Sequence, residues 1–196
     1  MADKVQSRRT TRTKRAICNA FAELMYEKEL GKITVQELVD RADVGRATFY
    51  KHYYDIYDVY EKIESDFLVE LGEIITEQGI KTEFEVYPAV LEYIRNNPKI
   101  FKMIFSPHNN VPLRQKLVKM VEGLNRMIWS ESFGVAMNDS MVECAIRYHS
   151  NGCLAIIENW VLGDFEQPQS FIIEALSGFD DSTQTSLNDW LDKKGK

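Results

Sequence analysis

The chain is poor in residues that interrupt regular structure and in residues that cross-link it. Its 196 residues include only 10 Gly, 5 Pro and 3 Cys. Strand-like alternation, internal repeats, low-complexity segments and a linker rich in Pro, Gly or Ser are not evident. We therefore expect an all-α chain whose helical parts follow one another without a flexible spacer.

The three cysteines, Cys18, Cys144 and Cys153, form neither a disulfide framework nor a zinc-binding pattern. Cys144 and Cys153 lie about half a turn out of phase on a helix, so they should face different ways. A secretory signal and a hydrophobic run long enough to span a membrane are also missing. These absences predict a reducing, cytoplasmic location without membrane contact.

Sets of residues that would indicate catalysis or a cofactor are lacking too. The sequence offers no convincing nucleophile–base set, Gly-rich phosphate loop or pair of catalytic carboxylates, so we do not expect an enzyme.

Charged residues are distributed unevenly along the chain. Residues 1–54 carry 11 Lys and Arg against 7 Asp and Glu, whereas the other 142 residues carry 13 against 23. A basic end on an acidic protein favours nucleic acid as a partner of that end.

A helix–turn–helix is predicted between Ile33 and Tyr53. Thr34 and Glu37 have the spacing of a capping box at a helix start, and Gly45 allows a sharp turn before a second short helix. Phe49 is the expected anchor of that second helix, because so short a helix must dock on its neighbours. Apolar stripes at helical spacing support the pair and a preceding helix at about 11–28: Val35, Leu38, Val39 and Ala42, and upstream Ile17, Ala20, Phe21 and Leu24.

Basic residues crowd the N-terminal end before this three-helix head. They are Arg8, Arg9, Arg12, Lys14 and Arg15. Next to a helix–turn–helix, such an arm is suited to attract phosphates and to enter a minor groove. The alternative is a solvated leader whose charge only serves solubility.

The head is similar to that of the TetR family of transcriptional regulators. The matching run is ITVQELVDRADVGRATFYKHYYDIYDVYEKI, preceded by RTKRAICNAFAELM, and it covers about the first third of the chain. The resemblance implies contacts with double-stranded DNA. By this resemblance, Arg46 and Ala47 would contact base edges, and Thr48 and Lys51 would lie at the groove. Tyr50 and His52 would hold phosphates. Thr34 would add a phosphate contact and Gln36 a base contact.

One position departs from the family pattern. Where the family often has a phosphate-binding Lys, three residues after Tyr53, this chain has Ile56. Affinity is therefore expected to depend more on the basic arm and on amides at the start of the next helix. Asp55 is the expected cap of that helix, with Asp58 at its third position.

The remaining residues, 55–196, are predicted to form a helical regulatory and dimerisation domain beside the DNA-binding domain 1–54. Helices are expected at 55–78, 84–96, 98–105, 111–130, 138 or 139–162 and 168–177, followed by a polar tail from 180, which makes about nine in the chain.

The helix at 141–162 is the most apolar one. In the TetR-like arrangement, the last two long helices pair with their symmetry mates, and Gly152 would permit close approach. The predicted dimer interface is Gly152, Ile156, Trp160, Phe171, Ile172 and Ala175. The run RYHSNGCLAIIENWVLGDF is similar to the C-terminal region of DhaS-like regulators, a short resemblance that implies no ligand.

His149 and Cys153 have the i, i+4 spacing of a metal chelate. Because the sequence places no further ligand beside them, we predict no metal here and a core histidine next to a buried thiol. His149 is alternatively a residue of an effector pocket with Phe101, Phe105, Met127 and Trp129, although these four are as readily plain core.

The sequence thus predicts a homodimeric regulator, most simply a repressor that binds a palindromic operator and is released by an unidentified small-molecule effector. The alternative is an adaptor or co-activator whose acidic domain binds a partner protein instead of a small molecule.

Overall fold

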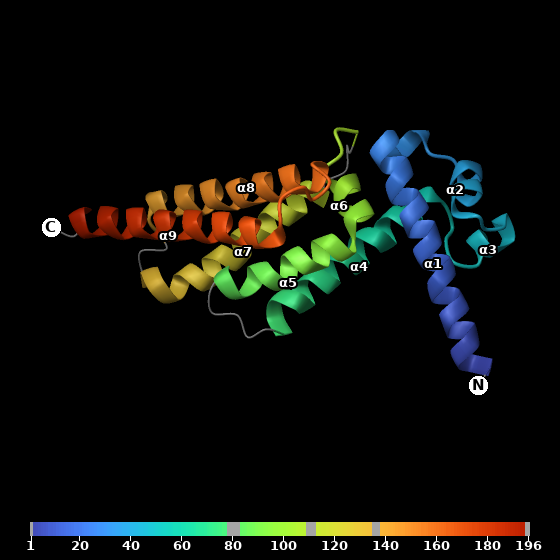
Figure 1. Cartoon of the computed structure of the whole chain (residues 1–196), viewed down its shortest axis with the longest axis horizontal. Coiled ribbons are helices and arrows are strands. Elements are labelled where there is room, and N and C mark those ends of the chain that lie inside the picture. Colours follow the sequence, from blue (N-terminus) through green and yellow to red (C-terminus); the bar gives the residue numbers. More distant parts are fainter. Residues whose placement is uncertain (1, 78–82, 109–112, 135–137, 195–196) are drawn as a thin grey trace. The chain divides into compact units, whose positions relative to one another are not determined.

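The computed structural model describes residues 2–77, 83–108, 113–134 and 138–194 (Figure 1). These residues contain nine α-helices, one 3₁₀ turn and no strand, which confirms the all-α prediction. The elements are α1 (Ala2–Glu27), η1 (Leu30–Lys32), α2 (Val35–Ala42), α3 (Arg46–Tyr50), α4 (Ile56–Glu77), α5 (Glu83–Asn96), α6 (Pro98–Ile104), α7 (Leu113–Phe133), α8 (Ser140–Leu162) and α9 (Gln169–Lys194).

The helices form two compact units. The first comprises Met1–Glu70 and Asn97–Val111, and the second comprises Leu71–Asn96 and Pro112–Lys196. The division falls within α4, and α6 belongs to the first unit. These units are defined by packing, whereas the predicted boundary after residue 54 separates the DNA-binding part from the regulatory part. That boundary stays a prediction.

In the first unit, α1 packs against α2 and α6, and α2 packs against α3. The apolar stripe predicted for α1 is buried, with Ile17 and Phe21 fully inaccessible to solvent. The helix begins at Ala2, earlier than expected, so the basic arm is its first turns. Residues 2–10 contain no Pro or Gly that would stop a helix, so extension of α1 meets no local obstacle.

In the second unit, α8 packs against α7 and α9, and α9 packs against α5. The core cluster consists of Ile128, Trp129, Phe133, Val142, Ile146 and Leu187. Asp139 caps α8, as predicted, because its carboxylate accepts a bond of 2.8 Å from the Met141 amide. The predicted end of the last helix near residue 177 is wrong, since α9 continues to Lys194. Its added turns are held by Asp180 and Leu187, which are both buried.

All three cysteines are free thiols, and the predicted difference between two of them is confirmed, since Cys144 is exposed and Cys153 is buried. None of the helices in the described part of the chain has both the length and the apolar character that crossing a bilayer requires.

Candidate nucleic-acid interface

The start of α2 is fixed by the predicted capping box. Thr34 Oγ1 accepts a bond of 3.2 Å from the Glu37 amide, and the Glu37 carboxylate accepts one of 3.0 Å from the Thr34 amide. Lys28 and the Thr34 hydroxyl also donate to the Glu37 carboxylate, and Lys28 and the two Thr34 donors lower the pKa of this carboxyl to about 2. The charged carboxylate therefore stabilises the helix start over the whole neutral range.

The turn between α2 and α3 differs from the prediction at one residue. Asp43, with φ 52° and ψ 49°, adopts the left-handed conformation, whereas Gly45 has φ −72° and caps α3. The Val44 amide donates to the Val39 carbonyl at 3.0 Å and closes the end of α2. Asp tolerates this conformation better than most residues with a side chain, so the turn does not need glycine there.

α3 is held by the predicted anchor. Phe49 is fully buried, and its ring lies 5.3 Å from that of Tyr50 and 5.7 Å from that of Tyr53, measured between centroids. A helix of five residues has little stability of its own, so this docking decides which of its faces is inside. The opposite face stays exposed.

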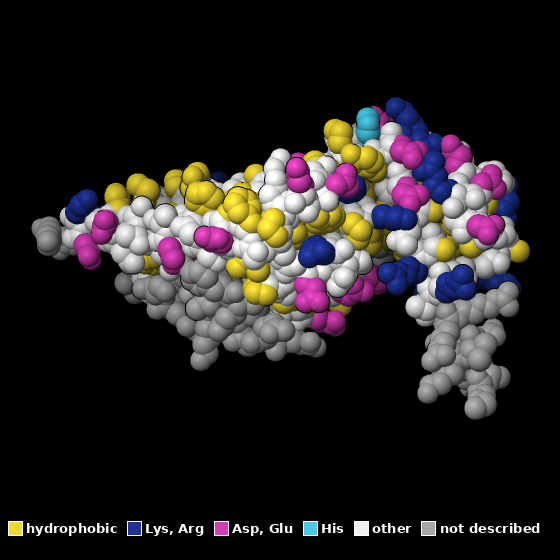
Figure 2. Space-filling view, viewed as in Figure 1, with side chains coloured by type: hydrophobic (Ala, Val, Ile, Leu, Met, Phe, Trp, Pro, Cys, Tyr) yellow, Lys and Arg dark blue, Asp and Glu magenta, His cyan; other side chains and the backbone are white. Residues whose placement is uncertain are grey.

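The residues that the family resemblance assigns to DNA lie on that open side of the head. Thr34, Gln36, Arg46, Ala47, Tyr50 and Lys51 are exposed, and Thr48 and His52 are half-buried. Arg46 donates to the Gln36 side chain at 3.2 Å, which brings the predicted base-contacting groups of α2 and α3 together. Arg12 of the arm is exposed, while the side chains of Arg8 and Arg9 lie outside the described residues. Figure 2 shows Lys and Arg side chains gathered over this part of the chain.

A polar hollow of about 530 Å³ lies beside α3. It is lined by Thr10, Thr13, Asp43, Val44, Gly45, Thr48, Lys51 and His52. Burial lowers the pKa of His52, and the positive charges of Lys14, Lys51 and Lys62 lower it further. The three lysines give this hollow a positive potential, which suits a phosphate.

The junction of α3 and α4 explains the departure at Ile56. This side chain is only 5% exposed, so it belongs to the core of the head and could not reach a phosphate. Asp55 accepts a bond of 2.9 Å from the Asp58 amide, which confirms the predicted cap of α4. Lys62, one turn further along, donates to the His52 carbonyl and to Asp58, both at 2.9 Å, and lies 5.0 Å from the centre of the Tyr53 ring.

Some candidate residues at this surface were missed at the sequence level. Tyr54 is 87% exposed and Tyr57 is 55% exposed, close to the polar face of α3 in the chain. Lys62 was missed as well, although its i, i+4 spacing from Asp58 could have indicated the ion pair. The aromatic residues carried no such signal, because their spacing is also that of a buried stripe.

Of the five residues predicted as an effector pocket, two belong to the first unit and three to the second. Phe101 and Phe105 are buried in the first unit, where the Phe101 ring packs on Phe67 at 5.2 Å. Met127 is 53% exposed. Only Trp129 and His149 meet, with ring centres 5.4 Å apart in the second unit. Burial lowers the pKa of His149 to about 4, so its ring is neutral near pH 7.

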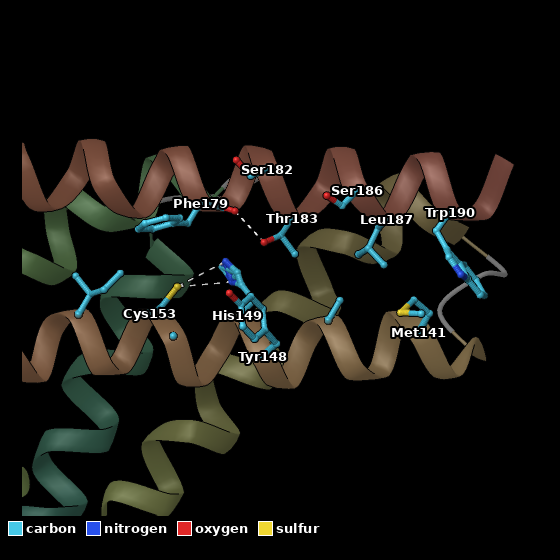
Figure 3. A pocket seen from close by; sticks show the side chains of 13 residues that line it. Met141, Tyr148, His149, Cys153, Phe179, Ser182, Thr183, Ser186, Leu187 and Trp190 are labelled. Carbon is cyan, nitrogen blue, oxygen red and sulfur yellow. Dashed lines mark hydrogen bonds between the residues drawn. The ribbon is translucent and has the colours of Figure 1, made fainter. Parts of the chain in front are cut away.

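The predicted dimer residues divide between core and surface. Trp160 and Ile172 are buried within the second unit, whereas Gly152 and Phe171 are exposed and Ile156 and Ala175 are half-buried. An apolar groove of about 650 Å³ runs between α8 and α9, as Figure 3 shows. Met141, Tyr148 and Phe179 stand exposed along it, and Gly152 and Ile156 line it. A row of hydrophobic side chains is visible over these helices in Figure 2.

Comparisons with known proteins agree with this architecture. The family model described as the C-terminal region of transcriptional regulators, of the TetR type, matches residues 81–179, about half of the chain. No protein of curated function matches the sequence.

Three solved structures share the fold. One, titled "Dihydroxyacetone kinase operon activator DhaS", has a TM-score of 0.53 at 18% identity and aligns over 85% of this chain and 94% of its own. A TetR-family regulator from Syntrophomonas wolfei scores 0.56 at 16% identity, over 87% and 93%. A TetR regulator from Streptococcus agalactiae scores 0.54 at 23% identity, over 90% and 96%. With the family match, the chain belongs to the TetR family of transcriptional regulators.

Proposed function

We propose that this protein is a homodimeric repressor that binds a palindromic operator through α3 of each subunit. Two such helices would enter successive major grooves about 34 Å apart. An effector that binds the second unit would change the separation of the heads and release the DNA. A change of a few ångströms is enough to prevent one of the two α3 helices from entering its major groove.

The main support for the DNA contact is the open face of α3. Phe49 is fully buried beneath it, while Arg46, Ala47, Tyr50 and Lys51 are exposed. Arg suits a guanine edge, Ala suits a thymine methyl group, and Lys and Tyr suit phosphates. His52, whose pKa is lowered by burial and by three nearby lysines, adds a site where a phosphate would be attracted.

The dimer is supported by the groove between α8 and α9. Tyr148 is 77% exposed and Phe179 is 60% exposed, and the pair lines a largely apolar surface that a second copy would cover. Glutamate in place of Phe179 should yield monomers in sedimentation experiments. Glutamate in place of Val69, an equally exposed apolar residue on α4, is the matched control and should leave the dimer intact.

A gel-shift series on operator DNA selected from a random pool tests the DNA contact. The double variant Arg46→Ala, Tyr50→Phe should reduce affinity about tenfold to a hundredfold, since a base contact contributes about 1–3 kcal/mol. The control Arg95→Ala, Tyr26→Phe removes one exposed cation and one tyrosine hydroxyl elsewhere. Unchanged affinity and sequence preference in the first variant would contradict the proposal.

Activation is the second candidate, because one of the similar structures is titled an operon activator. In that case the second unit would bind a partner protein, and the exposed groove would be the surface available to it. Transcription from the selected operator, measured with and without the protein, separates the two: repression lowers the transcript, and activation raises it.

A further inference from the structure

Four polar side chains meet inside the second unit, and two of them, His149 and Cys153, also line the groove between α8 and α9. His149 and Cys153 come from α8, Asp180 from α9 and Tyr87 from α5. All are buried: His149 is 5% exposed, Cys153 and Tyr87 are 8%, and Asp180 is fully inaccessible. Ligand atoms of the first three lie within 4.8 Å of one another.

The bonds between these groups join them into one cluster. Asp180 bonds His149 Nε2 through one carboxylate oxygen and accepts a bond of 2.5 Å from the Tyr87 hydroxyl through the other. Cys153 Sγ lies 3.6 Å from the His149 ring nitrogens and 3.8 Å from the Tyr87 oxygen. Figure 3 shows the thiol and the ring side by side on α8.

An aspartate without solvent contact is unusual in a helical core. Removing a carboxylate from water costs several kcal/mol, and a hydrophobic residue of similar size would often serve stability as well. Three different donor types, nitrogen, sulfur and oxygen, therefore converge where packing alone would favour apolar side chains. This combination matches the ligands of Zn²⁺ and similar cations.

The spacing of the cluster fits such an ion. Tetrahedral zinc, with bonds of about 2.3 Å to sulfur and about 2.0 Å to nitrogen, separates these two atoms by about 3.6 Å. The separation of Cys153 Sγ from His149 Nε2 is 3.6 Å. The His149–Asp180 pair is closer than two ligands of one ion, because a proton now bridges them. The ion would take the place of this proton.

We propose that His149, Cys153 and Asp180 form a binding site for a thiophilic divalent cation such as Zn²⁺. On binding, the Cys153 thiol releases its proton to solvent, and the proton on His149 Nε2 moves to Nδ1, so that sulfur, Nε2 and a carboxylate oxygen become ligands. Tyr87 keeps its bond to the other carboxylate oxygen and orients it. The fourth position is open to water. The bound ion joins α8 to α9.

Co²⁺ is the probe, added to the full-length reduced protein after chelator treatment. The wild type should bind one ion per chain and show a sulfur-to-cobalt charge-transfer absorption together with the intense visible bands of tetrahedral cobalt. Zn²⁺ should displace Co²⁺ and remove both absorptions. Because the ring of Trp129 lies 5.4 Å from that of His149, its fluorescence should be quenched as the ion binds.

Three variants test the site, each checked for folding by circular dichroism. Cys153→Ser should abolish the charge-transfer band, whereas Cys144→Ser, at an exposed thiol on the same helix, should leave it unchanged. Tyr87→Phe should keep the band but weaken binding about 10- to 100-fold. The absence of a band in the wild type, or its persistence in Cys153→Ser, would overturn the proposal. These readouts need no DNA, so they are independent of the proposed repressor function.

Discussion

Lys62 is expected to hold the end of α3 on α4, and its replacement by Met gives a sharp test. The Lys62 ammonium donates to the His52 carbonyl and to Asp58, and it also lies 5.0 Å from the centre of the Tyr53 ring. Met keeps most of the aliphatic length and removes the charge and the donors. The residues that follow α3 would then no longer be tied to α4 through this ammonium.

The expected loss is about 1–2 kcal/mol of local stability. A charge-assisted bond contributes about 1.5–3 kcal/mol when shielded, but much less when exposed. The Lys62 side chain is 45% exposed, so we take about 0.5–1 kcal/mol for its bonds to His52 and Asp58. The cation–π interaction adds about 0.5–1 kcal/mol. Together these correspond to about 5- to 30-fold more frequent local opening.

Hydrogen exchange on the free protein measures this directly. Amides between Val44 and Ile56 should exchange about 5- to 30-fold faster in Lys62→Met. Lys32→Met is the matched control, because Lys32 is 67% exposed and its carboxylate partner Glu29 is 3.5 Å away. If both variants exchange like the wild type at these amides, Lys62 does not position α3. Operator affinity should fall no more than the opening frequency rises.

Three further predictions concern the head. Removal of residues 2–9 should weaken binding to all DNA sequences and flatten its salt dependence by about 0.9 in slope for each phosphate that the arm neutralises; an unchanged slope would mean a solvated leader. Phe49→Ala should destabilise the head by about 3–5 kcal/mol and abolish operator binding. The wavelength of tryptophan emission should not change in that variant, because Trp129, Trp160 and Trp190 all belong to the second unit, and a shift to longer wavelength would show that the units unfold together. Finally, operator affinity should rise as the pH falls from about 8 to about 6, the range around the ordinary pKa of histidine. His52 has a lowered pKa in the free protein, and a bound phosphate would raise it, so binding takes up a proton. His52→Gln should remove this dependence, and an equal dependence in that variant would exclude His52 as its source.

Local signals in the sequence predicted the head well. The Thr34–Glu37 capping box, the Asp55 cap and the buried Phe49 all involve residues a few positions apart, where backbone geometry restricts the outcome. The turn was the exception, since Asp43 and not Gly45 takes the left-handed conformation. The sequence shows that a glycine is able to adopt this conformation. The position at which α2 ends decides which residue has to adopt it. The roles assigned to Arg46 and its neighbours came from resemblance and stay predictions.

By itself, the sequence determined the helical class, the helix–turn–helix and most of the helix starts, because capping and periodicity depend on neighbours along the chain. Only the tertiary structure decided how far α9 continues and what meets His149. Asp180 follows His149 by 31 residues, and Tyr87 precedes Asp180 by 93. Periodicity indicates which face of a helix is apolar, but not which face of another helix will lie against it. The pairing of α8 with α9 and of α9 with α5 therefore adds Asp180 and Tyr87 to the pair His149 and Cys153, which makes a buried cluster of four polar groups.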